Sequence, residues 1–257
     1  MASPAPGRER PLVLLSNDDG YRAPGIGILR DALREAFDVV VCAPETQQSA
    51  TSHALTLSRP MRLHDHGDGI RSLDGTPADC VYVALHSGKK VLPRRPALVV
   101  SGMNHGLNLG TDVFYSGTVA AAREGALRGY PSIACSASHE TDMVAASRFV
   151  TKLALATLSE AAGTPLLLNV NFPPGAEWPV RSTRLGARVY TDTVEFRKDP
   201  RGMEYLWLGG PGAEHRPMPG SDTEAFDEGA VSVTPLLLDL FAGEGAEGTA
   251  RIVRRSQ

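Results

Sequence analysis

Short apolar runs alternate with stretches of helical periodicity from residue 11 to about residue 170, and this alternation leaves few possible architectures. Residues 12–15 and 38–43 are mostly apolar, as expected of strands buried on both faces. Between them, Ile26, Leu29 and Leu33 recur at helical spacing. A strand, a helix and a strand within about 30 residues form a βαβ unit, which requires a parallel sheet.

The same pattern repeats further along the chain. It predicts helices over 76–85, 117–127 and 143–156, and strands over 97–100, 132–136 and 166–170. The chain has 257 residues, of which 42% are hydrophobic and 21% are charged, so it can bury a substantial core. We therefore predict an α/β fold with a Rossmann-like, doubly wound core around a mostly parallel sheet.

The character of the chain changes after Pro173 and Pro174. Two segments rich in β-forming residues, 184–196 and 203–208, flank a turn sequence, so we expect a C-terminal extended β-hairpin arm. The Gly- and Pro-rich stretch that follows is predicted to be a loop over 209–220, and a late strand is predicted over 231–234. The expected organisation is a loose leader (1–10), the α/β core (11–175), an arm with a return segment that serves oligomerisation (176–240) and a flexible tail (241–257).

Charge and cysteine content limit the surroundings and partners of the protein. A formal net charge of −3 argues against nonspecific binding to nucleic acid polymers or to an anionic membrane. Cys42, Cys80 and Cys135 lie far apart among apolar neighbours, which predicts buried, reduced thiols rather than a catalytic cysteine.

No segment approaches the roughly 20 apolar residues of a membrane-spanning helix, and no signal-peptide cleavage site follows the N-terminal apolar run. We expect a cytoplasmic protein.

Polar segments follow three of the predicted strands, and the first of them contains two adjacent acids, Asp18 and Asp19. Because ligands bind beyond the carboxyl ends of parallel strands, the three segments should open onto one edge of the sheet. Two neighbouring carboxylates repel each other by on the order of 1 kcal/mol where water is partly excluded. With oxygens from Ser49 and Asn104 they form an oxygen-only set suited to Mg²⁺ or Mn²⁺. Alternatively, one of the acids caps the helix that begins near Pro24.

A second candidate element lies between residues 101 and 118. Glycines and asparagines at close spacing over 101–110 allow unusual backbone angles and the close approach of a ligand. A helix is expected to begin directly afterwards, with Ser116 as its N-cap and with the free N–H groups of Gly117 and Thr118 facing an anion such as phosphate. A capped helix that simply packs on the sheet is the alternative.

Several short motifs occur in a fixed order along the chain. They are N-D-D-G at 17–20, A-P-G at 23–25, G-T-P-x-D-C-V at 75–81, S-G-x-N-x-G-x-N-x-G at 101–110, D-V-F-Y-S-G-T-V-A-A-A-R-E-G at 112–125, N-V-N-F-P at 169–173, D-T-E-A at 222–225 and V-S-V-T-P-L at 231–236. Each motif is weak alone, but the ordered set is specific. From about residue 11 to residue 240 the chain resembles the survival protein SurE family.

The resemblance implies a metal-dependent 5′-nucleotidase that hydrolyses nucleoside 5′- and 3′-monophosphates, with short-chain polyphosphate as a further substrate in some members. By motif position, it implies one divalent cation per subunit, Mg²⁺ or Mn²⁺. The implied metal ligands are Asp18, Asp19, Ser49 and Asn104. Of these, Asp18, Asp19 and Asn104 would also take part in catalysis.

The resemblance carries over to the substrate and to the assembly as well. The residues implied to contact the substrate are Asn17, Ser116, Gly117 and Thr118. The family fold implies a C-terminal arm that is exchanged between the subunits of a homodimer or homotetramer.

One segment departs from the family pattern. The loop that carries the family's serine ligand commonly reads R-S-G-x-S/G-x-x-L-T, whereas Gln48 and Ala50 replace the arginine and the glycine in this chain. Alignment to the following Leu-Thr pair makes Ser49 the matching serine, with Ser52 as a nearby rival. Ala50 in place of glycine also predicts a less flexible loop.

The proton donor and the base-binding residue stay open. His53 and His105 are close to the motifs and could protonate the leaving oxygen, although a histidine in a loop is more often an incidental surface residue. Tyr115 could stack on a nucleobase, but a buried spacer is the expected role.

Two other classes of function compete with the nucleotidase. One is a metal-dependent glycosyltransferase, which usually separates its paired acids by one residue and needs an acceptor domain. The other is a non-catalytic sensor of nucleotides or polyphosphate on the same fold. A dehalogenase-type phosphatase is disfavoured because its two acids are separated by one residue, whereas Asp18 and Asp19 are adjacent.

Overall fold

A computed structural model describes residues 9–160, 166–190, 194–209 and 212–256. Its centre is a nine-stranded sheet in the order β3-β4-β2-β1-β5-β6-β7-β13-β8. The inner strands β1 (Leu12–Ser16), β2 (Asp38–Pro44), β5 (Leu98–His105), β6 (Ser132–Ala137) and β7 (Leu167–Phe172) pair in parallel. Their apolar side chains are buried on both faces, as the continuous apolar runs predict.

Shorter strands extend the sheet at both edges. On one side, β4 (Ile70–Leu73) runs parallel to β2, and β3 (Leu63–Asp65) runs antiparallel to β4. On the other side, β13 (Val231–Leu236) returns from the C-terminal region to pair antiparallel with β7, and β8 (Val180–Ser182) lies beside β13. The predicted, mostly parallel sheet is therefore confirmed.

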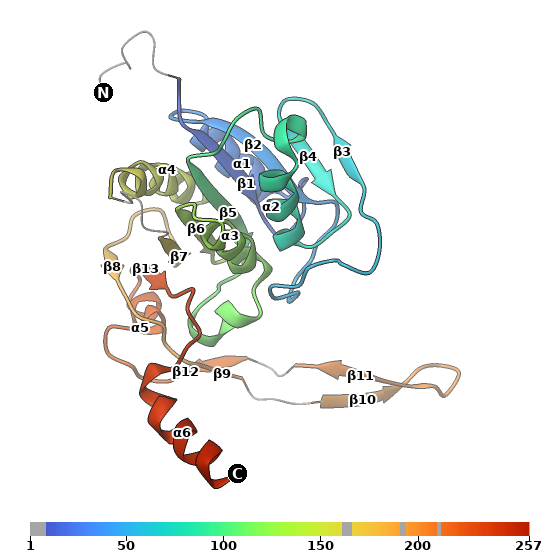
Figure 1. The fold of residues 1–257 in the computed structure, drawn as a ribbon, viewed down its shortest axis with the longest axis vertical. Coiled ribbons are helices and arrows are strands. Elements are labelled where there is room, and N and C mark those ends of the chain that lie inside the picture. Colours follow the sequence, from blue (N-terminus) through green and yellow to red (C-terminus); the bar gives the residue numbers. More distant parts are fainter. Residues whose placement is uncertain (1–8, 161–165, 191–193, 210–211, 257) are drawn as a thin grey trace.

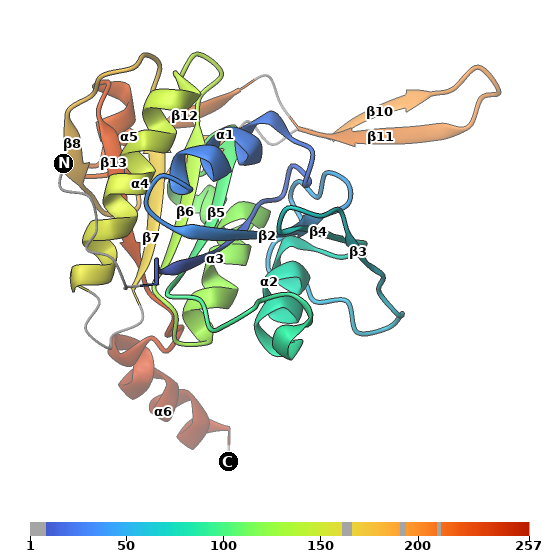
Figure 2. The same ribbon diagram turned by 90° about the horizontal axis from the view of Figure 1, so that it is seen from above.

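Helices cover both faces of the sheet (Figures 1 and 2). On one face, α1 (Pro24–Leu33) packs against α4 (Met143–Glu160), and on the other α2 (Pro77–His86) packs against α3 (Gly117–Leu127). A capping box begins α2, in which Thr76 accepts from the Asp79 N–H and Asp79 accepts from the Thr76 N–H. The 3₁₀ turns η1 (Gly88–Lys90) and η2 (Gly110–Phe114) lie in the connections. The doubly wound architecture is confirmed.

The C-terminal part forms an arm beside this core. Strands β9 (Arg188–Tyr190) and β12 (Ala213–His215) pair at its base, and β10 (Val194–Lys198) pairs with β11 (Glu204–Leu208) in a hairpin that projects away from the core (Figure 1). The chain then returns through α5 (Asp222–Asp227) to β13. The expected hairpin arm is present.

Two expected loops contain strand structure. The stretch expected to be a loop from residue 101 begins as strand, because β5 continues to His105 past an irregularity between Ser101 and Asn104, with β6 as its backbone partner. Gly102 makes this path possible, since a Cβ there would lie 2.4 Å from the Cys135 carbonyl oxygen. The predicted loop over 209–220 likewise contains β12, because β9 offers a pairing edge that the local sequence does not reveal.

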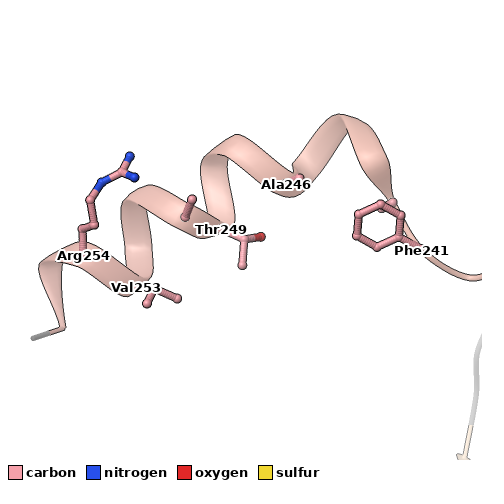
Figure 3. Close-up of a pocket in the computed structure, with 7 residues that line it drawn as sticks. Phe241, Ala246, Thr249, Val253 and Arg254 are labelled. Atoms are coloured by element: carbon pink, nitrogen blue, oxygen red, sulfur yellow. The ribbon is translucent and has the colours of Figure 1, made fainter.

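The segment expected to be a flexible tail, 241–257, contains regular secondary structure in its described residues. After the 3₁₀ turn η3 (Gly243–Gly245), residues Ala246–Arg255 form helix α6, whose alanine, glutamate and arginine residues favour a helix. Phe241 precedes the helix, and Ala246, Thr249 and Val253 line a shallow pocket along it (Figure 3). No residue of α6 is buried, and the helix projects from the core (Figure 1).

Two further expectations concern the termini and the cysteines. The leader expected over 1–10 lies outside the described residues except for two exposed residues at its end. Cys42, Cys80 and Cys135 are free and buried, as predicted, and burial raises the pKa of the Cys80 and Cys135 thiols. Within the described ranges, no helix is long and apolar enough to cross a membrane.

Candidate active site

An open cleft of about 470 Å³ lies where β1, β2 and β5 end. Its wall includes all four residues expected to bind a metal, and these are Asp18, Asp19, Ser49 and Asn104. Asp18 and Asp19 follow β1, Ser49 follows β2, and Asn104 lies near the end of β5, so the sheet topology brings them together.

Asp18 is the most buried acid of the cleft, with 5% of its surface exposed. The hydroxyl of Thr118 and the backbone N–H of Thr118 both donate to its carboxylate. Burial nevertheless raises the pKa of Asp18 to about 6, because the charged form loses solvation and the nearby Asp19 repels it. Gly117 makes this packing possible, since a Cβ there would lie 2.8 Å from the Asp18 Cβ.

Asp19 and Asn104 present further oxygens beside Asp18. Asp19 is half-buried, and its Oδ2 accepts a hydrogen bond of 3.2 Å from the His105 backbone N–H. The Asn104 amide nitrogen donates to the Gly106 carbonyl oxygen at 2.8 Å. With its nitrogen engaged in this bond, the side chain of Asn104 has its amide oxygen available to a cation.

The loop after β2 contributes Ser49 to the cleft, and not Ser52. Ser49 lines the cleft, and its Oγ accepts a hydrogen bond of 3.1 Å from Gln47. Ser52 donates its hydroxyl to the Phe114 carbonyl oxygen at 2.6 Å and is not among the cleft residues. Ala50 and Ser52 both have left-handed backbone angles, with φ of 56° and 53°, so this segment holds strain that its tertiary contacts must balance.

The chemistry of this set fits a hard divalent cation. Among the described residues, no cationic side chain forms an ion pair with Asp18 or Asp19, and no cluster of three His, Cys, Asp or Glu residues surrounds them. Two carboxylates with neutral amide and hydroxyl oxygens are ligands that suit Mg²⁺ or Mn²⁺. The buried oxygens Ser16 Oγ, Asn17 Oδ1 and Ser101 Oγ, at this edge of the sheet, also have no hydrogen-bond partner within the described part of the chain.

The residues expected to bind phosphate occupy different positions. Ser116 lines the cleft, although its Oγ is the N-cap acceptor for the Val119 N–H at 3.0 Å. Gly117 and Thr118 lie behind the cleft wall, and the Thr118 N–H serves Asp18 instead of a free anion. Asn17 does not line the cleft as expected, because it is fully buried and its amide donates to the Gly20 carbonyl oxygen.

The arm also contributes to the cleft. Tyr190 lines it, and the Tyr190 hydroxyl donates to Asp112 Oδ1 at 2.8 Å while Arg188 Nη1 lies 2.5 Å from Asp112 Oδ2. Burial and the Asp112 charge raise the pKa of Tyr190 to about 12. Sequence reasoning missed Tyr190 because 78 positions separate it from Asp112.

The aromatic and histidine candidates can now be placed. Tyr115 lines the cleft and is 67% exposed, so it is not the buried spacer that the sequence suggested. His105 also lines the cleft, with its ring nitrogen 3.1 Å from His139. His53 instead pairs with the buried Glu124 at 2.8 Å, outside the cleft.

The doubly wound sheet and the oxygen-lined cleft at its carboxyl edge define an α/β protein whose ligand site lies where parallel strands end. The chain belongs to the survival protein SurE family, whose family model matches residues 13–192.

Similar proteins support the same assignment. The 5′-nucleotidase SurE of Sorangium cellulosum (strain So ce56) is 64% identical over 249 residues, covering 95% of this chain and 96% of that protein. The 5′-nucleotidase SurE of Anaeromyxobacter sp. (strain Fw109-5) is 49% identical, covering 88% of this chain and 90% of that protein. The crystal structure of the SurE protein from Aquifex aeolicus has a TM-score of 0.81 at 36% identity, covering 94% of this chain and 99% of that one.

Proposed function

We propose that the chain is a 5′-nucleotidase, a metal-dependent phosphomonoesterase that hydrolyses nucleoside monophosphates to nucleoside and phosphate. The observation that carries the proposal is the convergence of Asp18, Asp19, Ser49 and Asn104 on one cleft. The names of the relatives that match nearly the whole chain support the same activity. We extend it to nucleoside 3′-monophosphates and to short-chain polyphosphate, since an open cleft does not enclose the leaving group.

One divalent cation per subunit, Mg²⁺ or Mn²⁺, completes the proposed site. Asp18 and Asp19 would hold it with carboxylate oxygens, and Ser49 and Asn104 would add neutral oxygens. When bound, the cation neutralises charge on the phosphoryl oxygens. Thr118 fixes the orientation of Asp18 through its hydroxyl and its backbone N–H, and therefore acts through Asp18.

The remaining groups of the cleft have proposed roles in catalysis and substrate binding. Asp19 orients the attacking water or accepts its proton, because Asp18 is more buried and is held by Thr118. His105 donates a proton to the leaving nucleoside oxygen, and its position in the cleft supports this role over His53, which is engaged with Glu124. Ser116, which lines the cleft at the start of α3, contacts the phosphoryl group.

Two tyrosines support recognition of the nucleoside. Tyr115 is exposed in the cleft, and Tyr190 reaches it from the base of the arm. An aromatic ring in this position can stack on a nucleobase regardless of its identity. We propose that Tyr115 provides this stacking surface.

The assembly and location follow from the arm and the composition. We propose that the segment 176–240 joins subunits in a homodimer or homotetramer, and the apolar hairpin β10–β11 supports this proposal. The absence of a membrane-spanning helix among the described residues is compatible with the proposed cytoplasmic location.

Release of inorganic phosphate from AMP in the presence of Mn²⁺ tests the proposal. The wild-type protein should release phosphate and lose this activity in EDTA, whereas Asp18→Asn should lower kcat by at least about 100-fold. The matched control is Asp31→Asn, an exposed acid on α1. A nucleotide sensor would release no phosphate, and a glycosyltransferase would release none from a monophosphate. Absence of phosphate release from AMP would therefore reject the nucleotidase.

A further inference from the structure

Two histidine side chains, His105 and His139, meet at the rim of the cleft, and we call them the histidine pair. His105 is the last residue of β5, and His139 lies in the turn after the neighbouring strand β6. The Nε2 atom of His105 lies 3.1 Å from the Nδ1 atom of His139, and both residues are exposed. Among the described residues, neither ring has another hydrogen-bond partner. The two facing nitrogens are therefore open to a ligand from solvent.

The backbone on both sides of the histidine pair is held in place. His105 pairs with Ala137 where β5 and β6 run side by side. Beyond β6, the Ser138 N–H donates to the Phe172 carbonyl oxygen, and the Thr141 N–H donates back to the Ser138 carbonyl oxygen. Because these bonds fix the turn that carries the second histidine, little backbone freedom is lost when a ligand binds the two rings.

The relative position of the two rings does not fit a straight hydrogen bond between them. In a straight N–H···N bond of the observed 3.1 Å, the ring centres would be more than about 5 Å apart. They are 4.3 Å apart, and the ring planes are inclined by 64°. The two nitrogens therefore lie side by side. Two nitrogens bound to one tetrahedral cation at about 2.05 Å are roughly 3.3 Å apart, so the observed separation suits a shared cation.

The chemistry of the histidine pair favours a different cation from the proposed active site. Imidazole nitrogen is a ligand that suits Zn²⁺, whereas Mg²⁺ and Mn²⁺ prefer oxygen. The Asp19 carboxylate accepts from the His105 backbone N–H at 3.2 Å, so a negative charge lies beside the pair. Neither histidine belongs to the four oxygen ligands of the proposed active site. The two positions therefore differ in the cation that they select.

We propose that His105 Nε2 and His139 Nδ1 bind one Zn²⁺ ion at the rim of the cleft, in addition to the hard cation of the proposed active site. Water molecules fill the remaining positions of the tetrahedral ion. Because Zn²⁺ engages Nε2 of His105, it also withdraws this side chain from the leaving oxygen and should inhibit AMP hydrolysis. That consequence, unlike the binding itself, rests on the proposed function.

Calorimetric titration of the full-length wild-type protein with Zn²⁺, in saturating Mg²⁺ and without substrate, tests the inference. One tightly bound Zn²⁺ is expected per chain. His139→Asn and His105→Asn each remove one ligand and should weaken binding by at least about tenfold. The matched control is His64→Asn, which changes an exposed histidine on β3 and should leave the affinity unchanged. Asp18→Asn should retain Zn²⁺ binding, because it alters only the oxygen ligands.

AMP hydrolysis supported by Mg²⁺ gives the second readout. Zn²⁺ should inhibit the wild-type protein and His64→Asn at the concentration at which it binds, whereas inhibition of His139→Asn should need at least about tenfold more. A protein that binds Zn²⁺ through the histidine pair but does not hydrolyse AMP would uphold the zinc site and reject only the proposed nucleotidase.

Two results would overturn the inference. Equal affinity of the wild-type protein and His139→Asn for Zn²⁺ would show that the ion binds elsewhere. Loss of Zn²⁺ binding in Asp18→Asn would show that Zn²⁺ replaces Mg²⁺ at the oxygen ligands instead of binding the histidine pair.

Discussion

The Nε2 atom of His53 lies 2.8 Å from Oε2 of Glu124, and this pair joins the loop that carries Ser49 to the middle of α3. Glu124 is almost fully buried, and its other oxygen accepts from Arg128 at 2.8 Å. Burial alone would raise the pKa of Glu124, but the hydrogen bonds from His53 and Arg128 outweigh it and hold the pKa below its ordinary value. The pair therefore anchors a loop that is otherwise irregular.

Replacing His53 should disturb the proposed metal site indirectly. In His53→Ala, the buried Glu124 carboxylate loses one partner, which should cost about 1.5–3 kcal/mol of unfolding free energy. The loop should also become more mobile, so amide exchange of Ser52 should accelerate in the metal-free protein, and Mn²⁺ affinity should fall. The control His64→Ala removes an exposed histidine on β3. Unchanged Ser52 exchange in His53→Ala would contradict the anchoring role.

Ala50 should be replaceable by glycine with a gain in stability. Its φ of 56° is a left-handed angle that costs an L-residue roughly 1–2 kcal/mol, whereas glycine adopts it freely. After the larger unfolded-state entropy of glycine is subtracted, Ala50→Gly should raise the unfolding free energy by about 0.5–1 kcal/mol. Urea denaturation measures the change. Ala54→Gly, in the same loop at a residue without a positive φ, should lower stability instead.

The stability of the metal-free protein should fall as pH rises from about 4 to about 6. Burial raises the pKa of Asp18 from its ordinary value of 3.8 to about 6, so in this window the folded chain holds a proton that the unfolded chain has released. The unfolding free energy should fall by about 3 kcal/mol in total, and the fall should be complete above pH 6. Urea denaturation in a chelating buffer at several pH values measures it. Saturating Mg²⁺ should reverse the loss, and a slope that persists in Asp18→Asn would assign it to another group.

The meeting of three strand ends at one cleft could be predicted from sequence because it follows from local periodicity. Apolar runs located β1, β2 and β5, and the rule that parallel strands end at one edge then grouped Asp18, Ser49 and Asn104. The hydrogen bond from Thr118 to Asp18 could not be predicted, since it spans 100 positions and depends on the packing of α3. Because this bond holds Thr118 against Asp18, Thr118 does not face a phosphate as the sequence suggested.

The contribution of the arm to the cleft could not be predicted from the sequence either. Asp222 is fully buried and accepts the N–H groups of Gly110 and Gly186, at 2.9 Å and 2.7 Å, which fixes the arm base against η2. Nothing in the local pattern around Tyr190 indicates that this contact brings its ring to the cleft. Likewise, the exposure of Tyr115 depends on how η2 meets α3, not on its neighbours in sequence.

Tyr115 should matter for nucleotides and not for a substrate without a base. If its ring stacks on the nucleobase, Tyr115→Ala should raise KM for AMP about tenfold, because such stacking contributes about 1–3 kcal/mol. KM for ribose 5-phosphate should change by less than about twofold, and Tyr115→Phe should retain the wild-type ratio. Steady-state phosphate release measures both substrates. A parallel rise in KM for AMP and ribose 5-phosphate would instead indicate a general disturbance of the cleft.

The hairpin β10–β11 should hold the assembly together through one of its faces. Phe196 pairs with Leu206 and Val194 pairs with Leu208, so these four exposed side chains lie on the same face of the two-stranded ribbon. An isolated hairpin is at best marginally stable in water, and an apolar face of this kind favours burial against another copy. Phe196→Asp should therefore shift sedimentation velocity profiles towards smaller species.

The opposite face of the ribbon provides the control. Glu195 lies opposite Trp207, one position away from Phe196, so its side chain points to the other side. Glu195→Gln removes a charge without changing the apolar face and should leave the oligomeric state unchanged. If Phe196→Asp and Glu195→Gln both sediment like wild type, the hairpin does not join the subunits, and the assembly must rest on another part of the chain.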